Sequence, residues 1–298
     1  MGHLVSVGTS LLRNGVRRLV SCVDGGGCGF DSGVVEGVVG FVEDCLRASV
    51  GSGDDLECLR VASGWGEVHR VLYDLVSGDP YRMSAELNAM RPWLESAAAG
   101  DSWSVGLVVL YPTSTGAGVL AGRVLQRYLA SVLPEGVSVE LEPVEGFERG
   151  VWPGLAGLAG RVREGVRRVL RAGGVAMLNA TGGFKPESGF MILAGLLHAS
   201  GKSYAYYIHE LHREPTVIPL ASRGHLECAA RRLAESSRRG EHAGAMIRLP
   251  PEEAVGECEW LRDYARILSP LGKSRVLEDG SLLFDPNIAL ALARVSGG

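Results

Sequence analysis

The chain has 298 residues, of which 46% are hydrophobic, and it carries a formal net charge of −4. This length and composition fit one large folded domain or two smaller ones, and the slight negative charge gives no general attraction to duplex nucleic acid. No uninterrupted apolar run reaches about 18 residues, and the first residues lack the pattern of a signal peptide, so we expect a cytoplasmic protein without a membrane span.

Predicted strands and helices alternate along the first 220 residues. We expect strands at 3–8, 105–111, 137–141, 175–178 and 203–208, and an edge strand at 216–220. We expect helices at 34–46, 83–94, 119–133, 155–170 and 188–199, the second stopping beyond Pro92 or kinking there, and a polar turn at 9–14. Because parallel neighbours need crossovers, this order predicts an α/β fold, a Rossmann-like doubly wound, mainly parallel sheet, over residues 1–221.

The remaining residues, 222–298, have a different character. Helices are predicted at 225–236 and 252–268, followed by a hairpin at 275–285 whose centre is Asp279-Gly280. This order predicts a small helical, winged-helix-like domain. Its ten arginines and Lys273 are balanced by eleven acidic side chains, which is a poor footprint for DNA binding, so we interpret it as an accessory or dimerising domain.

Lysine is rare in this chain, and one lysine stands out by its position. Three of the thirty basic residues are lysines, and Lys185 ends the run Asn-Ala-Thr-Gly-Gly-Phe-Lys directly after the strand predicted at 175–178. A compact ammonium behind two glycines suits a close contact with phosphate. The pair Thr9-Ser10 follows the first predicted strand in the same way. Ligands of such sheets bind beyond the carboxyl ends of the strands, so both turns are predicted to build one phosphate-handling site.

A second glycine motif offers a competing interpretation. Gly116-Ala117-Gly118 lies between a strand and a helix, and Glu140 and Glu142 end the next predicted strand. This arrangement satisfies a loose dinucleotide fingerprint and would fit a nicotinamide-dependent oxidoreductase. The plainer interpretation is a close contact between helix and sheet.

The six cysteines show neither a Cys-x-x-Cys pair nor nearby histidines at zinc-ligand spacing. We therefore predict free thiols, no structural metal and no cofactor, with a Cys22–Cys28 disulfide as the alternative.

The turn Val-Gly-Thr-Ser-Leu-Leu-Arg-Asn at 7–14 and the run at 179–185 resemble motifs of the CARF family, the CRISPR-associated Rossmann-fold sensors of cyclic oligoadenylate. Weaker similarity lies at 83–88 and 111–116, and the resemblance spans residues 1–220. It implies a homodimer with the cyclic RNA across its two-fold axis. Many relatives carry a HEPN ribonuclease domain marked by an Arg and a following His with four to six residues between them, whereas Arg238 and His242 have three between them and Arg60 and His69 have eight. Neither Arg238 with His242 nor Arg60 with His69 has the required spacing, so the chain resembles the stand-alone ring nucleases of archaeal type III systems.

That resemblance implies an RNA endonuclease that cuts cyclic tetra-adenylate without metal, through attack of the ribose 2′-hydroxyl. The products would be linear di-adenylates with a 2′,3′-cyclic phosphate, and antiviral signalling would be switched off. Ser10 and Lys185 would be catalytic. The ligand-binding residues implied are Gly8, Thr9, Leu11, Arg13, Asn14, Thr113, Ser114, Thr115, Arg149, Trp152, Asn179, Thr181, Gly182, Gly183 and Phe184. The alternative is a sensor that regulates transcription, binding cyclic oligoadenylate and DNA without cleavage.

Several of these residues have simpler alternatives. Ser10 is also a favoured N-cap for a following helix, and Lys185 also fits a solvated loop. Asn179 and Thr181 are common turn formers. Trp152 suits either stacking on adenine or anchoring a core, and Arg149 either a phosphate contact or a solvated surface.

Overall fold

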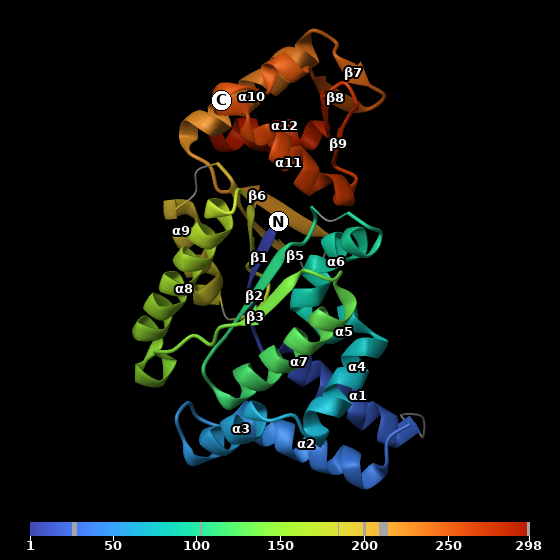
Figure 1. The fold of residues 1–298 in the computed structure, drawn as a ribbon, viewed down its shortest axis with the longest axis vertical. Helices are drawn as coiled ribbons and strands as arrows, with labels where there is room; N and C mark the ends of the chain where they lie inside the picture. Colours follow the sequence, from blue (N-terminus) through green and yellow to red (C-terminus); the bar gives the residue numbers. More distant parts are fainter. Residues whose placement is uncertain (26–28, 102, 184, 199–200, 209–213, 297–298) are drawn as a thin grey trace.

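The computed structural model describes residues 1–298 except 26–28, 102, 184, 199–200, 209–213 and 297–298. A central sheet lies between two layers of helices (Figure 1). The helices at residues 32–63 lie beyond one end of this body, and the C-terminal segment lies beyond the other.

Six strands build the central sheet. They are β1 (Gly2–Val7), β2 (Leu107–Pro112), β3 (Ser138–Leu141), β4 (Ala176–Asn179), β5 (Ser203–Ile208) and β6 (Pro215–Pro219), in the spatial order β3-β2-β1-β4-β5-β6. The first five strands are parallel, and β6 is antiparallel to β5 at the edge. The predicted Rossmann-like, mainly parallel α/β sheet is therefore confirmed.

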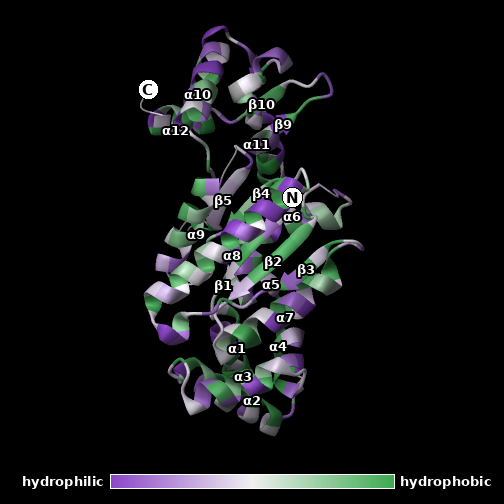
Figure 2. Cartoon of the chain, turned by 60° about the vertical axis from the view of Figure 1, so that its left-hand side comes forward, coloured by the Kyte–Doolittle hydropathy of each residue, from purple (hydrophilic) through white to green (hydrophobic). Residues whose placement is uncertain are grey.

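Helices cover both faces of the sheet. One face carries α1 (Ser10–Gly25), α4 (Glu67–Gly78), α5 (Pro80–Met83), α6 (Ala85–Ala98) and α7 (Gly116–Val132), and the other carries α8 (Val151–Arg171) and α9 (Lys185–His198). Alternate residues of each strand serve the two faces: Leu4 and Val109 join the core under α8, whereas Val5 and Val108 join the core under α6 and α7. The hydropathy colouring follows this burial, with apolar strands inside and helices of mixed polarity outside (Figure 2).

Some element boundaries differ from the predictions. Helix α1 starts at Ser10, where a polar turn was expected, and α9 starts at Lys185, three residues earlier than predicted. Helix α6 continues past Pro92 to Ala98 because Met90, Trp93 and Leu94 are buried on either side of the proline, and this packing outweighs the missing hydrogen bond. Helices α3 (Gly53–Ser63), α4 and α5 were not predicted.

The C-terminal segment forms a smaller antiparallel sheet with three helices. It contains α10 (Arg223–Arg238), β7 (His242–Ala243), β8 (Met246–Leu249), α11 (Trp260–Leu268), β9 (Ser274–Val276), β10 (Leu282–Phe284) and α12 (Pro286–Ser296). The predicted hairpin is present as β9–β10, where Gly280 has a φ of 81°. Helix α11 is shorter than predicted, because residues 251–253 and 256–258 form 3₁₀ turns instead. A domain boundary at 221/222 stays a prediction.

Within the described residues, no helix is both long and apolar enough to cross a membrane.

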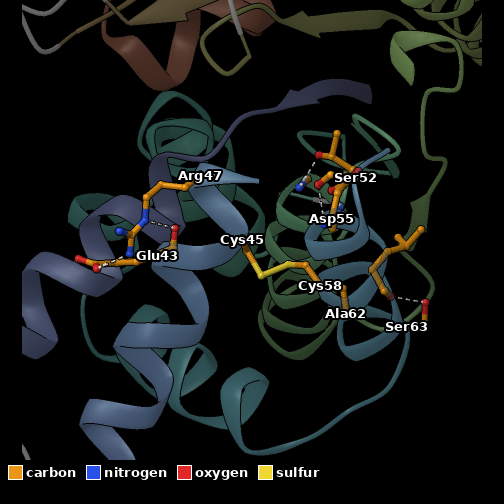
Figure 3. Close-up of a disulfide and its surroundings, with 12 residues drawn as sticks. Glu43, Cys45, Arg47, Ser52, Asp55, Cys58, Ala62 and Ser63 are labelled. Atoms are coloured by element: carbon orange, nitrogen blue, oxygen red, sulfur yellow. Dashed lines mark hydrogen bonds and ion pairs between the residues drawn. A yellow bond between two sulfur atoms is a disulfide. The ribbon is translucent and has the colours of Figure 1, made fainter. Parts of the chain in front are cut away.

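The prediction of free thiols is wrong. Cys45 of α2 (Ser32–Arg47) forms a disulfide with Cys58 of α3 (Figure 3), and Cys228 of α10 forms one with Cys258. The Cα atoms lie 5.6 Å and 5.7 Å apart, an ordinary distance for such a bond. Sequence separations of 13 and 30 residues gave no sign of this, because only the packing of the helices brings each pair together. Cys28 lies outside the described residues, so the Cys22–Cys28 bond stays a prediction.

Removing the disulfides is expected to destabilise the fold. In the chain-entropy description, closing loops of this size stabilises by about 3 kcal/mol each. The double variant Cys45→Ser/Cys58→Ser should therefore unfold at a lower temperature than the wild-type protein, as measured by calorimetry. Dithiothreitol should lower the unfolding temperature of the wild type more than that of the variant. Equal unfolding temperatures for oxidised wild type and variant would contradict the prediction.

Candidate functional site

The two predicted turns lie at the point where the sheet reverses its winding. Strands β1 and β4 are neighbours, but the chain leaves β1 toward the face covered by α1 and leaves β4 toward the face covered by α9. In open α/β sheets this switch point is where ligands bind, beyond the carboxyl ends of the strands. Residues 8–10, residues 180–183 and Lys185 all lie at those carboxyl ends.

The two turns are in direct contact. A Cβ atom added to Gly8 would lie 2.6 Å from the backbone nitrogen of Gly183, and the Ser6 hydroxyl donates to the Gly182 carbonyl at 2.9 Å. Gly183 also has a φ of 78°, which favours glycine. Glycines at these positions therefore allow a backbone approach that larger residues would prevent.

A buried carboxylate, that of Glu86, joins the turns to helix α6. Its side chain is 1% exposed. Glu86 Oε1 accepts from the Gly8 N–H at 2.8 Å, and Oε2 accepts from the hydroxyls of Ser10 at 2.8 Å and Ser84 at 2.7 Å. A Cβ atom on Gly182 would lie 2.3 Å from Oε1. Glu86 thus touches both turns at once.

No functional role was predicted for Glu86. The sequence did contain a signal for the start of this helix. Ser84 is the N-cap of α6 and accepts from the Leu87 N–H, and serine is a favoured residue at that position. A glutamate in the first turn of a helix ordinarily faces water, however, and nothing local showed that this one is buried.

The hydroxyl of Ser10 is directed away from its own helix. It donates to Glu86 and accepts from the Ala85 N–H at 3.2 Å, so it bridges α1 to the start of α6. Thr9 accepts the first backbone bond of α1, from the Arg13 N–H at 3.0 Å. Ser10 is therefore the first helical residue and not the N-cap that the simpler alternative proposed.

Lys185 is exposed and is the first residue of α9, so this cation belongs to the positive end of a helix of 14 residues. A helix N-terminus with an adjacent cation favours anions such as phosphate. Phe184, the preceding residue, lies outside the described residues.

Asn179 and Thr181 are used within the protein. Asn179 is fully buried, its amide donates to the Glu86 carbonyl at 3.0 Å, and its Oδ1 accepts from the Thr181 N–H at 3.1 Å. Thr181 Oγ1 accepts from the Ile208 N–H at 3.3 Å. Burial raises the pKa of Tyr206, which lies beside Asn179 and stays protonated. Both predicted residues therefore shape the turn, as their simpler alternative proposed.

The first turn of α1 contributes one exposed cation. Arg13 is exposed and its Nε donates to Thr9 Oγ1 at 3.2 Å. The Asn14 amide donates to the carbonyls of Arg82 and Met83 at 3.1 Å and 3.2 Å. Leu11 is fully buried, so its side chain belongs to the core.

The residues after β2 form a helix cap. Thr115 accepts from the Gly118 N–H and bonds to Thr113 at 2.9 Å, while the Ser114 N–H donates to the Val144 carbonyl. The buried Asp55 of α3 accepts from the Gly116 N–H at 2.7 Å. An acidic side chain thus already occupies the N-terminus of α7, where a pyrophosphate would have to bind.

The glycines of that motif are explained by packing. Cβ atoms on Gly116 and Gly118 would lie 2.4 Å from Cys58 Cβ and Thr113 Oγ1. The close contact of Gly116 is therefore with helix α3, and the dinucleotide interpretation loses its support.

The start of α8 brings Trp152 to the same edge. Trp152 is 71% exposed, so the alternative of a core anchor is wrong, and its ring meets Phe190 of α9 edge-on with centroids 5.9 Å apart. Arg149 is exposed and pairs with Glu148 at 3.2 Å.

In the part of the chain that the structure describes, no three His, Cys, Asp or Glu side chains gather in a way that could hold a metal ion.

A protein-family model described as CRISPR-associated protein (Cas_APE2256) matches residues 81–221. The matched segment runs from α5 to the end of the central sheet and includes Glu86 and Lys185, whereas Ser10 precedes it. The predicted similarity to CRISPR-associated Rossmann-fold proteins is confirmed over this segment.

A methyl group at the junction of the turns should damage the fold. In Gly182→Ala the new Cβ would meet Glu86 Oε1 and, at 2.5 Å, the Ser6 carbonyl oxygen, both buried. Overpacking of this kind destabilises by about 1–3 kcal/mol, measurable by urea unfolding. Gly37→Ala in α2 is the matched control, because nothing lies within 4 Å of its added Cβ, and it should be neutral or stabilising. Equal stability of the two variants would refute the described contact.

Proposed function

We propose that this CRISPR-associated chain is a ring nuclease that binds cyclic tetra-adenylate at the carboxyl ends of β1 and β4 and cleaves it without metal. Such cleavage would switch off type III antiviral signalling. The observation that carries the proposal is the contact between the two turns through Glu86, which sets the Ser10 hydroxyl beside the turn that leads into Lys185.

The chemistry is a transesterification within the RNA. The ribose 2′-oxygen forms a bond to the adjacent phosphorus while the bond from phosphorus to the 5′-oxygen breaks. The 2′-proton passes to solvent, and the leaving 5′-oxygen takes up a proton. Two such cuts turn the ring of four nucleotides into two linear di-adenylates, each with a 5′-hydroxyl and a 2′,3′-cyclic phosphate. The protein has to hold the 2′-oxygen in line and stabilise the charge that develops on the phosphate.

Lys185 and the N-terminus of α9 supply the positive charge for that phosphate. Arg13 adds a second exposed cation on the β1 side of the edge. Trp152, exposed beside the second turn of α9, offers a flat ring on which an adenine can stack. Together with the Ser10 hydroxyl, these groups can contact the three parts of a nucleotide: the cations its phosphate, Ser10 its sugar and Trp152 its base.

A second copy of the chain is the proposed partner. Helix α9 has an apolar outer face at Leu193, Leu196 and Leu197, which continues to Val151 and Trp152 of α8. At their exposed fractions these five side chains present about 600 Å², and a two-fold contact covering both copies buries about 1,200 Å², the lower end of specific interfaces. Because Lys185 opens the same helix that carries this face, such a pairing would bring two copies of the site to one side of the dimer, as a symmetric ring requires.

The alternative, a sensor that binds DNA through its C-terminal segment, finds less support. Five basic side chains of the segment form ion pairs with acidic side chains of the same segment; they are Arg223, Arg232, Arg239, Arg248 and Lys273. Phosphate binding would have to replace these pairs, and the segment has no excess of basic residues.

The activity is tested by incubating the protein with cyclic tetra-adenylate in EDTA and separating the products. Lys185→Ala and Ser10→Ala should each slow cleavage at least about tenfold, which corresponds to about 1.4 kcal/mol of transition-state stabilisation. Lys202→Ala is the matched control and should cut at the wild-type rate. Lys202 is an exposed lysine that precedes β5 and so lies at the opposite edge of the sheet. Wild-type rates in both site variants would refute the assignment.

The dimer is tested by placing a charge on the α9 face. Leu197→Glu should convert the dimer to a monomer in sedimentation experiments, because an unpaired charge would be buried at the contact. Val295→Glu is the control, since Val295 is 72% exposed in α12 and Leu197 is 71% exposed in α9. The control should leave the assembly intact. A wild-type protein that sediments as a monomer, or a Leu197→Glu variant that stays dimeric, would contradict the proposed face.

A further inference from the structure

The hydrogen bonds of Ser10 limit what its hydroxyl can offer a ligand. A serine hydroxyl has one proton to donate and two lone pairs that accept. The proton is directed to Glu86 Oε2 at 2.8 Å, and one lone pair accepts from the Ala85 N–H at 3.2 Å. One lone pair is left, so the remaining partner of Ser10 has to be a donor.

The surroundings of Glu86 keep the Ser10 proton in place. The Ser84 hydroxyl accepts from the Leu87 N–H at 3.2 Å and donates its own proton to Glu86 Oε2 at 2.7 Å. The third contact of the carboxyl group, from Gly8, is a backbone N–H. Glu86 therefore accepts in all three hydrogen bonds, which is the behaviour of the ionised carboxylate. Hydrogen bonds to an ionised acceptor are about twice as strong as neutral ones, and Glu86 is 1% exposed and already in place at 2.8 Å, so any ligand oxygen would have to displace a buried carboxylate to take the Ser10 proton.

We propose that Glu86 is a positioning residue that makes the Ser10 hydroxyl an acceptor, so that Ser10 takes the ribose 2′-hydroxyl of an RNA ligand and not a phosphate oxygen. This inference rests on the proposed function in one respect, namely that the ribose of the bound ring reaches Ser10. A phosphodiester has no proton to donate at neutral pH. A phosphate oxygen at Ser10 would face the remaining lone pair of the hydroxyl and would be repelled by the Glu86 carboxylate, which lies 2.8 Å from the hydroxyl oxygen.

The arrangement divides the work between the two turns. With its proton directed at Ser10, the 2′-hydroxyl keeps its own lone pairs free to face the phosphorus. The phosphate is left to Lys185 and the start of α9, on the other turn. Glu86 contacts neither the sugar nor the phosphate and acts through Ser10 alone.

The experiment compares cyclic tetra-adenylate with its 2′-deoxy analogue in EDTA. Dissociation constants are obtained by rapid mixing, from association and dissociation recorded before turnover. The wild-type protein should bind the 2′-deoxy ring about 25- to 100-fold more weakly, because the ring loses one hydrogen bond to Ser10 in each of the two copies and each bond is worth about five- to tenfold. Ser10→Ala should bind both rings alike. Lys185→Ala should weaken both rings by the same factor, because it removes a phosphate contact.

Two further variants separate positioning from folding. Glu86→Gln presents an amide that can donate to Ser10 and release its proton, so the preference for the 2′-hydroxyl should disappear. Glu95→Gln makes the same change from carboxylate to amide at an exposed position later in α6, where Glu95 pairs with Arg91, and should keep the preference. If Glu86→Gln does not fold, Ser10→Ala still decides the question.

The outcomes distinguish this inference from the proposed function. If the wild type binds neither ring, the proposed function fails. If it binds both rings equally, or if Ser10→Ala keeps the wild-type preference, Ser10 does not take the 2′-hydroxyl and the inference is overturned while ligand binding stands.

Discussion

The candidate site depends on one buried carboxylate and the donors that surround it. Removing an ionised Glu86 from water without hydrogen-bond donors would cost several kcal/mol, so the chain has to present a backbone N–H and two hydroxyls to it. This requirement fixes the turn at Gly8 and Ser10 against the start of α6. It also leaves no room for a side chain at Gly182. The geometry of both turns therefore follows from satisfying a single charge.

The same charge makes the two sides of the edge electrostatically unlike. On the β1 side, the backbone N–H groups ahead of α1 already face a carboxylate through Gly8. On the β4 side, α9 begins with an exposed lysine. Anionic groups of a ligand are therefore favoured near α9, and uncharged donors near α1. A nucleotide, with its phosphate and its sugar hydroxyls on neighbouring atoms, carries groups of both kinds.

The sequence was sufficient for the sheet and for the turns but not for what joins them. Continuous apolar runs identify buried parallel strands, and the polar residues that follow them mark the edge at which Ser10 and Lys185 lie. The role of Glu86 was not predicted, because a glutamate near a helix start is ordinarily solvated. Its burial depends on Gly8 and Ser10, which are more than seventy residues away in the sequence. The disulfides were not predicted for the same reason, because the packing of the helices and not the sequence spacing brings Cys45 to Cys58.

Helix α6 links this site to the C-terminal segment. Its first turn carries Glu86, and two turns further on the fully buried Trp93 donates from Nε1 to the Ile267 carbonyl of α11 at 3.1 Å. Tyr264 of α11 stacks on Tyr204 of β5 with an interplanar angle of 6°, so the segment is held to the sheet as well as to α6. A helix fixed at both places cannot shift at one end alone. The C-terminal segment is thus part of the scaffold that sets the position of Glu86, although it lies at the opposite end of the sheet (Figure 1).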